Sequence, residues 1–361
     1  MFCCLLCSFP SSAYGQNATT SQDSLDIRYE GDLIEVTATR HTRLIFDVPY
    51  AIESIDQIQI QRGEIGYSLE ENLRSVPGVI VNNRNNTSQG DRVTIRGLGS
   101  RASFGVRGVK IIQDGIPLTM ADGQSQLNNL DLTSAGQIEV VRGPNSSLYG
   151  NAAGGVLNIL TQGAPDTPIE VTPRFIFGSN GLRRLQGKAT GKVGGHEYLI
   201  NFNSFWFDGY RDHAFARSNG INAVGRHTLN DKVQITTVFN FFKAPYQFNP
   251  SSLDKTTSDT TPTSARSFVQ RQGASKKVTQ GQGGITLSYR DDRQSADVTV
   301  FGMGRTLFNP IPGGIIDLKR KGGGVRGVYS RQVRMGQSTF RITGGTDIEF
   351  QSDDRQEFSN G

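Results

Sequence analysis

The pattern Gly97-x-Gly99-x-x-Ala102 is the first stretch of this sequence that could do chemistry, because it follows a predicted strand and has the form of a dinucleotide-binding fingerprint. That chemistry requires the next residues to open a helix whose N-terminus receives a pyrophosphate. Gly105 and Gly108 would fall inside that helix, and no parallel strand-helix-strand unit follows. The sequence therefore disfavours a nucleotide site.

The other reactive side chains do not form a catalytic set. The four histidines, at positions 41, 196, 213 and 227, are dispersed, and no nucleophile motif or pair of carboxylates stands in a recognisable context. All three cysteines, at positions 3, 4 and 7, lie in one short apolar N-terminal run. We therefore expect no enzyme, no cofactor and no metal site, and a mature chain without thiols or disulfides.

A run of short predicted strands separated by glycine-rich turns positions the residues discussed below. The strands cover 92–96, 109–113 and 138–141, and the turn Asp114-Gly115-Ile116-Pro117 follows the second of them. Small residues at 152–155 let backbones approach closely before another strand. A domain with this many glycines and short strands has a modest core of its own, so we expect it to pack inside or against something larger.

One helix is predicted before this run, from Ser68 to Val79. Ser68 would cap it, Glu71 stands three residues later, and Pro77-Gly78 stops it. Its apolar residues share one face, which is typical of a core helix without a site.

Three motifs close the glycine-rich run in order. They are Ile138-Glu139-Val140-Val141-Arg142-Gly143-Pro144, then Leu148-Tyr149-Gly150, then Gly154-Gly155-Val156-Leu157-Asn158-Ile159. Together they resemble the plug domain of TonB-dependent outer-membrane receptors. The resemblance covers about residues 32 to 361 in organisation, but it is residue-specific only in the plug and the short segment before it. It implies a plug domain at 41–165.

Residues 1–15 are predicted to be a signal peptide whose start is incomplete, because no basic residue precedes the apolar run. Small residues at positions 13 and 15 fit cleavage before Gln16, and the large residues before Cys4 and Cys7 disfavour a lipoprotein. Residues 16–40 are then a periplasmic segment that begins with a polar leader.

A short strand-like segment follows this leader. It consists of Asp32, Leu33, Ile34, Glu35, Val36, Thr37 and Ala38. The segment resembles the family's TonB box, where the energising protein docks, and an apolar strand without its own core can pair with the edge of a partner's sheet. The alternative is an ordinary first strand of the plug. Since only about sixteen residues separate the predicted cleavage before Gln16 from the box, we expect a transporter without an additional signalling domain.

After residue 165 the hydrophobic pattern changes to a period of two. Ile200 and Phe202 alternate with Asn201, and the same alternation recurs in later segments. No apolar run is long enough for a membrane helix, whereas an apolar face beside a polar one is typical of strands in a membrane barrel. A soluble β-sandwich would show similar alternation.

The predicted connections favour the barrel because they are alternately short and long. Short turns at 194–195, 230–231 and 291–293 alternate with connections at 208–220, 243–276 and 309–314. Outer-membrane barrels have short periplasmic turns and long extracellular loops, so the first strand, at about 170–178, should run outward. About nine strands fit into 166–361, whereas plugged transporters close with about 22, so we expect a fragment or a truncated product. The predicted fold class is an α+β plug domain followed by a partial antiparallel transmembrane β-barrel.

The resemblance implies a receptor in the outer membrane of a Gram-negative bacterium that imports a scarce ligand by TonB-driven movement of the plug. Iron chelates such as ferric siderophores are the commonest ligands of the family. The sequence of residues 101–129 most resembles receptors for ferric citrate, siderophores and pyrroloquinoline quinone. Another cofactor such as cobalamin, and a non-pumping surface receptor or pore, are the alternatives. The expected partners are TonB, outer-membrane lipid and a small-molecule ligand, with no nucleic acid, because the net charge of +5 is small and scattered.

In such plugs three loops rise toward the outside, and here they map to 82–91, 98–107 and 118–129. The residues in them that could bind a ligand are Asn83, Arg84, Arg101, Phe104, Gln124, Gln126 and Asn128. They could hydrogen-bond and neutralise an anionic chelate while an aromatic ring packs on it. Each could equally be a solvated loop residue. Because the arginines of these loops outnumber the carboxylates, we expect an anionic ligand.

Arg96 and Arg142 each end a predicted plug strand and precede a glycine. In the family, arginines at these places pair with barrel glutamates and lock the plug, and Glu139 in the same motif is assigned to this lock. The alternative is that they are solvated strand ends.

Overall fold

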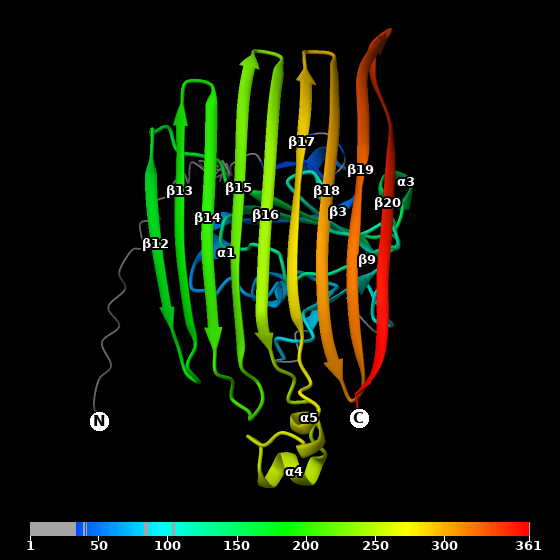
Figure 1. Cartoon of the computed structure of the whole chain (residues 1–361). Helices are drawn as coiled ribbons and strands as arrows, with labels where there is room; N and C mark the ends of the chain where they lie inside the picture. Colours follow the sequence, from blue (N-terminus) through cyan, green and yellow to red (C-terminus); the bar gives the residue numbers. More distant parts are fainter. Residues whose placement is uncertain (1–33, 39, 41, 83–85, 103–104, 361) are drawn as a thin grey trace, which may run out of the picture. The chain divides into compact units, whose positions relative to one another are not determined.

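A computed structural model describes residues 34–38, 40, 42–82, 86–102 and 105–360 of the chain. Two parts can be distinguished within them: a mixed domain with short strands, which corresponds to the predicted plug, and a wall of long antiparallel strands (Figure 1). Several side chains of the plug bond to the wall, so the two parts are in direct contact.

The plug is built on a five-stranded sheet in the order β3-β10-β11-β7-β8. Its strands are β3 (Ala51–Asp56), β7 (Val109–Gln113), β8 (Ile116–Pro117), β10 (Ala135–Arg142) and β11 (Gly155–Thr161). Only β11 and β7 are parallel, and the other neighbours are antiparallel. Gly155 takes a φ of +146°, and a Cβ there would lie 2.1 Å from the carbonyl oxygen of Val141, so this close approach of two backbones requires glycine.

Short pairs of strands and short helices complete the plug. The pairs are β1 (Glu35–Val36) with β2 (Arg43–Leu44), β4 (Val79–Asn82) with β5 (Arg92–Ile95), and β6 (Val106–Arg107) with β9 (Gln124–Ser125). The helices are η1 (Ile45–Asp47), α1 (Gln57–Gln61), α2 (Glu70–Leu73) and α3 (Ser146–Tyr149). The next element after Gly97-x-Gly99-x-x-Ala102 among the described residues is the strand β6.

The helix predicted from Ser68 to Val79 is wrong in length, because α2 forms only a single turn. The carboxylate of Glu71 accepts hydrogen bonds from the backbone N–H groups of Gly66 at 2.6 Å, Tyr67 at 2.9 Å and Ser68 at 2.8 Å. These bonds fold the preceding chain back over the start of the helix. After Leu73 the backbone continues as separate turns, and Gly78 at a φ of +75° redirects it into β4.

The wall is a single nine-stranded sheet, and its strands lie side by side in chain order in front of the plug (Figure 1). The strands are β12 (Glu170–Phe177), β13 (Arg183–Val193), β14 (His196–Phe207), β15 (Ala216–Asn230), β16 (Val233–Gln247), β17 (Lys277–Arg290), β18 (Gln294–Ile311), β19 (Gly313–Met335) and β20 (Ser338–Asn360). All neighbours are antiparallel. The prediction of about nine strands and a partial antiparallel barrel is confirmed.

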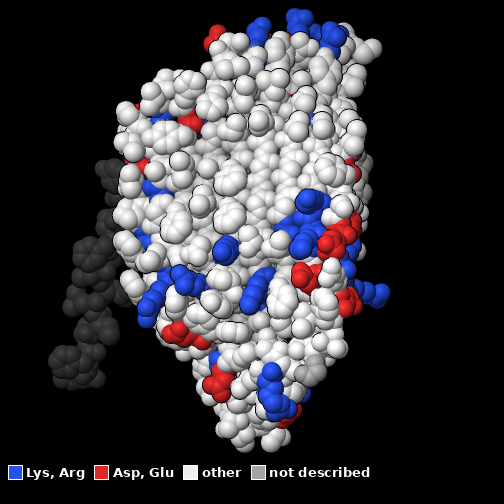
Figure 2. Space-filling view, in the orientation of Figure 1, with Lys and Arg blue, Asp and Glu red and all other residues white. Residues whose placement is uncertain are grey.

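Side chains of the wall alternate between an inner face against the plug and an outer face. In β14, Ile200 and Phe202 are 52% and 47% exposed, whereas Asn201 is buried and donates to Asp131 of the plug at 2.6 Å. The polar residues of the pattern thus point inward and the apolar ones outward, as in a membrane barrel. Figure 2 views the outer face and shows a broad uncharged region, with Lys and Arg gathered nearer to α4 and α5.

The connections of the wall differ in length at its two ends. One end has only short turns, at 194–195, 231–232, 291–293 and 336–337. The other end, called the long-loop end here, has connections at 178–182, 208–215 and 248–276, the last with α4 (Lys255–Thr260) and α5 (Ser267–Arg271). The predicted last connection shrinks to residue 312, because β18 and β19 pair over nearly their whole length.

No helix of the described residues is both long enough and apolar enough to cross a membrane.

Candidate functional site

A cavity of about 710 Å³ lies between the plug and the inner face of the wall. The plug contributes residues in 63–74, 86–91 and 127–131, and the wall contributes residues of β13 to β16. Residues 180 and 182, in the turn after β12, and Tyr210, in connection 208–215, also line it, so the cavity extends toward the long-loop end.

An aromatic pair forms one side of this cavity. The ring of Tyr67 from the plug stacks on Phe205 of β14 with 4.2 Å between ring centroids. Burial raises the pKa of Tyr67, so its phenol stays neutral and acts as a hydrogen-bonding group. This side can pack against an apolar or aromatic part of a ligand.

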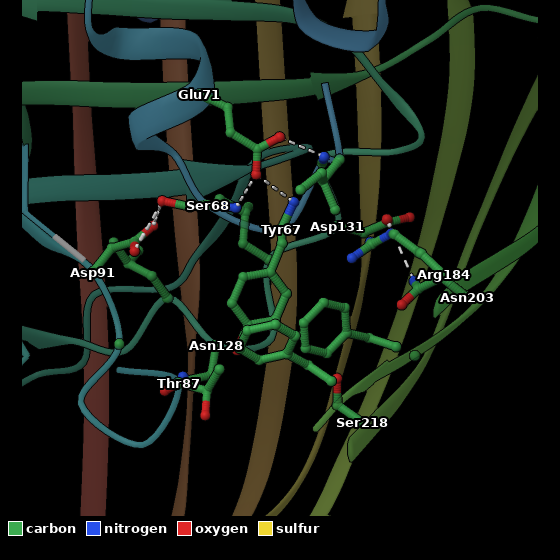
Figure 3. A pocket seen from close by; sticks show the side chains of 18 of the residues that line it. Tyr67, Ser68, Glu71, Thr87, Asp91, Asn128, Asp131, Arg184, Asn203 and Ser218 are labelled. Atoms are coloured by element: carbon green, nitrogen blue, oxygen red, sulfur yellow. Dashed lines mark hydrogen bonds between the residues drawn. The ribbon is translucent and has the colours of Figure 1, made fainter. Parts of the chain in front are cut away.

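Two carboxylates at the cavity, those of Asp91 and Asp131, are occupied by hydrogen bonds from the protein (Figure 3). Asp91 accepts from the Ser68 hydroxyl at 3.0 Å and from the backbone N–H of Leu69 at 2.8 Å, and burial raises its pKa to about 6. Asp131 accepts from hydroxyl groups of the plug and from Asn201 of the wall. These groups shape the plug and are not free acceptors for a ligand.

Four buried polar atoms on residues that line the cavity have no protein partner among the described residues. They are Oγ1 of Thr87, Oδ1 of Asn129, Nε of Arg184 and Oδ1 of Asn240. Because buried polar groups are normally hydrogen-bonded, these atoms lack the partner that an ordered water or a shift of the neighbouring side chains would supply. The sequence pattern offered one signal for the wall residues, since Arg184 and Asn240 stand at inward positions of the period-two alternation.

The residues predicted to bind ligand are only partly brought together. Asn83, Arg84 and Phe104 lie outside the described residues. Asn128 lines the cavity, whereas Arg101, Gln124 and Gln126 are not among its lining residues. Sequence reasoning missed Tyr67, Phe205 and Arg184, because the plug loop and the wall strands that carry them are far apart in the chain.

The segment predicted as a TonB box is divided by the structure. Asp32 and Leu33 lie outside the described residues, and Ile34 and Glu35 are exposed. Val36 and Ala38 are buried in the plug core, and β1 pairs with β2. The second half of the segment is therefore the first strand of the plug, which is the alternative that the sequence left open.

Glu139 holds that second half in place. Its buried carboxylate accepts from the backbone N–H groups of Thr37 at 2.8 Å and Ala38 at 2.6 Å, and from Asn158 Nδ2 at 3.0 Å. Its assignment to a lock between plug and barrel is therefore wrong, because the carboxylate bonds to the N-terminal segment and to Asn158, all within the plug.

Arg96 and Arg142 both bond to the turn at residues 77–78 of the plug. The backbone N–H of Arg96 donates to Gly78 O at 2.8 Å, and Arg142 Nη1 donates to Pro77 O at 3.0 Å. Arg142 also lies 3.6 Å from Glu53 of the plug. Among the described residues no carboxylate of the wall bonds to either arginine, so their pairing with barrel glutamates stays a prediction.

Other ionic contacts join plug and wall in this structure. Arg40 bonds to Asp347 at 2.6 Å and Lys110 bonds to Glu349 at 2.9 Å. Both carboxylates are on β20, more than 200 positions further along the chain.

The glycine-rich plug contacts the polar inner face of the antiparallel sheet, whose outer face is apolar and which has long loops at one end. This combination defines a plugged outer-membrane barrel. The chain contains a TonB-dependent receptor plug domain, since residues 45–156 match the TonB-dependent Receptor Plug Domain. It is therefore an outer-membrane protein of a Gram-negative bacterium, in a family of receptors rather than enzymes.

Curated relatives and solved structures agree with this assignment. A hemin receptor of Yersinia pestis is 29% identical over 238 residues, which are 63% of this chain and 32% of that protein. The vitamin B12 transporter BtuB of Photobacterium profundum is 32% identical over 214 residues, 54% of this chain and 33% of that protein. The unliganded ferric citrate transporter FecA has a TM-score of 0.72 at 18% identity, over 88% of this chain and 50% of that chain. BauA, the ferric preacinetobactin receptor from Acinetobacter baumannii, has a TM-score of 0.72 at 12% identity, over 90% and 50%. This chain thus spans about a third of the curated relatives' length.

Proposed function

We propose that the full-length protein imports a scarce ligand across the outer membrane with energy from TonB, and that this ligand is a ferric siderophore or another iron chelate. The cavity of about 710 Å³ between plug and wall carries the proposal. Its volume lies in the range of small-molecule sites, and it combines an aromatic pair with buried polar atoms that lack partners.

The names of similar proteins favour iron chelates and keep alternatives open. The solved structures with this fold include receptors named for ferric citrate and ferric preacinetobactin, and the curated relatives are named for hemin and vitamin B12. Hemin, cobalamin and pyrroloquinoline quinone are therefore the second candidates.

Docking of TonB fits the exposed start of the N-terminal segment. Ile34 and Glu35 are exposed, and the adjoining Thr37 and Ala38 are bonded to Glu139 in the plug sheet. A partner strand that pairs with the exposed part would be connected to β10 through these bonds, so a pull on the segment would reach the plug.

Growth assays with the full-length gene test the proposal. Iron limitation is used for ferric citrate, hydroxamate and catecholate siderophores and hemin, and growth that depends on the added cofactor is used for cobalamin and pyrroloquinoline quinone. Ile34→Pro should abolish growth on the transported ligand but leave its binding at the cell surface intact, because proline removes a backbone donor and fixes φ. Ile34→Ala is the matched control and should grow, since it keeps the backbone N–H. Equal growth of the proline variant and the wild type would instead support a non-pumping receptor or pore.

A further inference from the structure

Two cations are buried at the inner face of the wall without a carboxylate partner. Lys276, directly before β17, is 6% exposed, and its Nζ donates to Asn128 Oδ1 at 2.9 Å. Arg305 of β18 is 4% exposed, and its Nη1 donates to Gln280 Oε1 at 2.6 Å. Neither cation makes an ion pair with another described residue. A buried charge whose partners are neutral amides is unfavourable unless a counter-ion joins it.

The carboxylates nearby are already engaged by other cations. Arg320, the cross-strand partner of Arg305, bonds to Asp353 at 2.7 Å and to Asp122 of the plug at 3.4 Å. Asp122 also lies 3.8 Å from Arg107. This part of the barrel interior therefore carries an excess of positive charge. Burial and the charge of Arg305 lower the pKa of Lys276 to about 7, as expected where a counter-ion is missing.

A chain of amides joins these cations to the plug loop at the cavity. Gln280 donates to Gln282 Oε1 at 3.1 Å, and Asn129 of the plug donates to the same oxygen at 3.2 Å. Asn128 and Asn129 both line the cavity, and Figure 3 shows Asn128 among its lining side chains. The Asn128 side chain therefore links the cavity to Lys276, and the Oδ1 of Asn129 has no protein partner.

We propose that Lys276 and Arg305 bind an oxyanion of the ligand, a carboxylate or a phosphate group, which enters from the cavity and replaces Asn128 at Lys276. This inference rests on the proposed function and adds the chemical class of the ligand. Bonds from an ammonium and a guanidinium to an oxyanion are stronger than bonds to amides, so the exchange is favourable. Asn128 loses its tie to the wall in the exchange, so anion binding loosens the plug segment 127–131.

Calorimetric titration of the purified full-length gene product in detergent tests the site, with citrate and inorganic phosphate as separate probes. Lys276→Gln and Arg305→Gln should each weaken binding about tenfold or more. Lys277→Gln is the matched control: the neighbouring side chain is exposed and its Nζ lies 5.8 Å from the ring centre of Phe308, so binding should not change. Binding of citrate alone assigns the site to carboxylates, and binding of phosphate alone assigns it to phosphates. If the wild type binds neither anion, or if both glutamine variants bind as the wild type does, the proposal is refuted.

Hydrogen exchange tests the displacement of Asn128. Addition of the bound anion should raise exchange in 127–131 of the wild type and leave it unchanged in Lys276→Gln. Asn128→Ala removes the competing acceptor and should bind the anion more tightly, so weaker binding would contradict this route. The binding experiments and the growth assay can fail separately. If uptake depends on Ile34 but no anion binds at Lys276, only the anion site is refuted. Anion binding without such uptake refutes only the pumping function.

Discussion

Replacement of Glu139 by alanine should release the N-terminal segment from the plug. The buried carboxylate accepts two backbone bonds, from Thr37 and Ala38, and one from Asn158. A hydrogen bond to a charged group contributes about 1.5–3 kcal/mol, so loss of the two backbone bonds alone corresponds to about 3–6 kcal/mol. Burial raises the pKa of Glu139, which shows that the carboxylate is desolvated, and removal of that cost offsets part of the loss. We therefore expect about 3 kcal/mol, confined to this segment.

Hydrogen exchange of the Thr37 and Ala38 amides measures this effect. A loss of about 3 kcal/mol should accelerate their exchange roughly a hundredfold, while the core amides of β10 keep their protection. Glu53→Ala is the control, because this glutamate on the adjacent strand β3 is half exposed and pairs with Arg142 at the surface. It should change exchange by less than about 0.5 kcal/mol. Unchanged protection of Thr37 and Ala38 in Glu139→Ala would refute the assignment of Glu139 as their anchor.

Three further predictions concern the plug and its contact with the wall. Burial raises the pKa of Asp91 from 3.8 to about 6, so between these pH values the folded state holds a proton that the unfolded state has released. The plug should therefore lose about 3 kcal/mol of its free energy of unfolding as the pH rises through this range. Asp91→Asn should abolish this dependence in hydrogen-exchange measurements at pH 4 and pH 7. Gly155→Ala should destabilise the plug by about 3 kcal/mol or more, because its Cβ would overlap the Val141 carbonyl; normal protection of β11 would contradict this. Asp131→Ala removes the carboxylate that accepts from the hydroxyl groups of Thr133 and Ser134 and from Asn201, and should cost about 1–3 kcal/mol in plug protection without altering the exchange of the wall strands outside β14; unchanged plug protection would count against it.

The wall could be predicted from local pattern because a strand sends successive side chains to opposite faces. The alternation of Ile200 and Phe202 with Asn201 predicted which residues face outward, and the structure places them so. Connection lengths likewise follow from where the alternation stops. The three longer connections are shorter than predicted, 208–215 instead of 208–220, 248–276 instead of 243–276 and residue 312 instead of 309–314, because strand pairing extends into residues that read as loops.

Partners of buried charges could not be predicted in this way. Glu139 stands in the most specific motif of the sequence, yet its partners Thr37 and Ala38 lie about a hundred positions away. Lys276 reads as the end of a long loop, and only the packing of that loop against the plug buries it beside Asn128. The role proposed for Lys276 depends on the lack of a carboxylate partner in the folded protein. The spacing of residues along the chain does not show which carboxylates lie near it.

The order of motifs and the period of the alternation determined the family, the plug and the strands of the barrel, because these are properties of neighbouring residues. Only the packing of plug and wall against each other decides which polar side chains are hydrogen-bonded and which cations lack a counter-ion. The same packing decides where a cavity remains. Hydrogen bonds and ion pairs between them join residues 70, 239 and 307 positions apart, so their identity depends on how the two parts pack and not on local sequence.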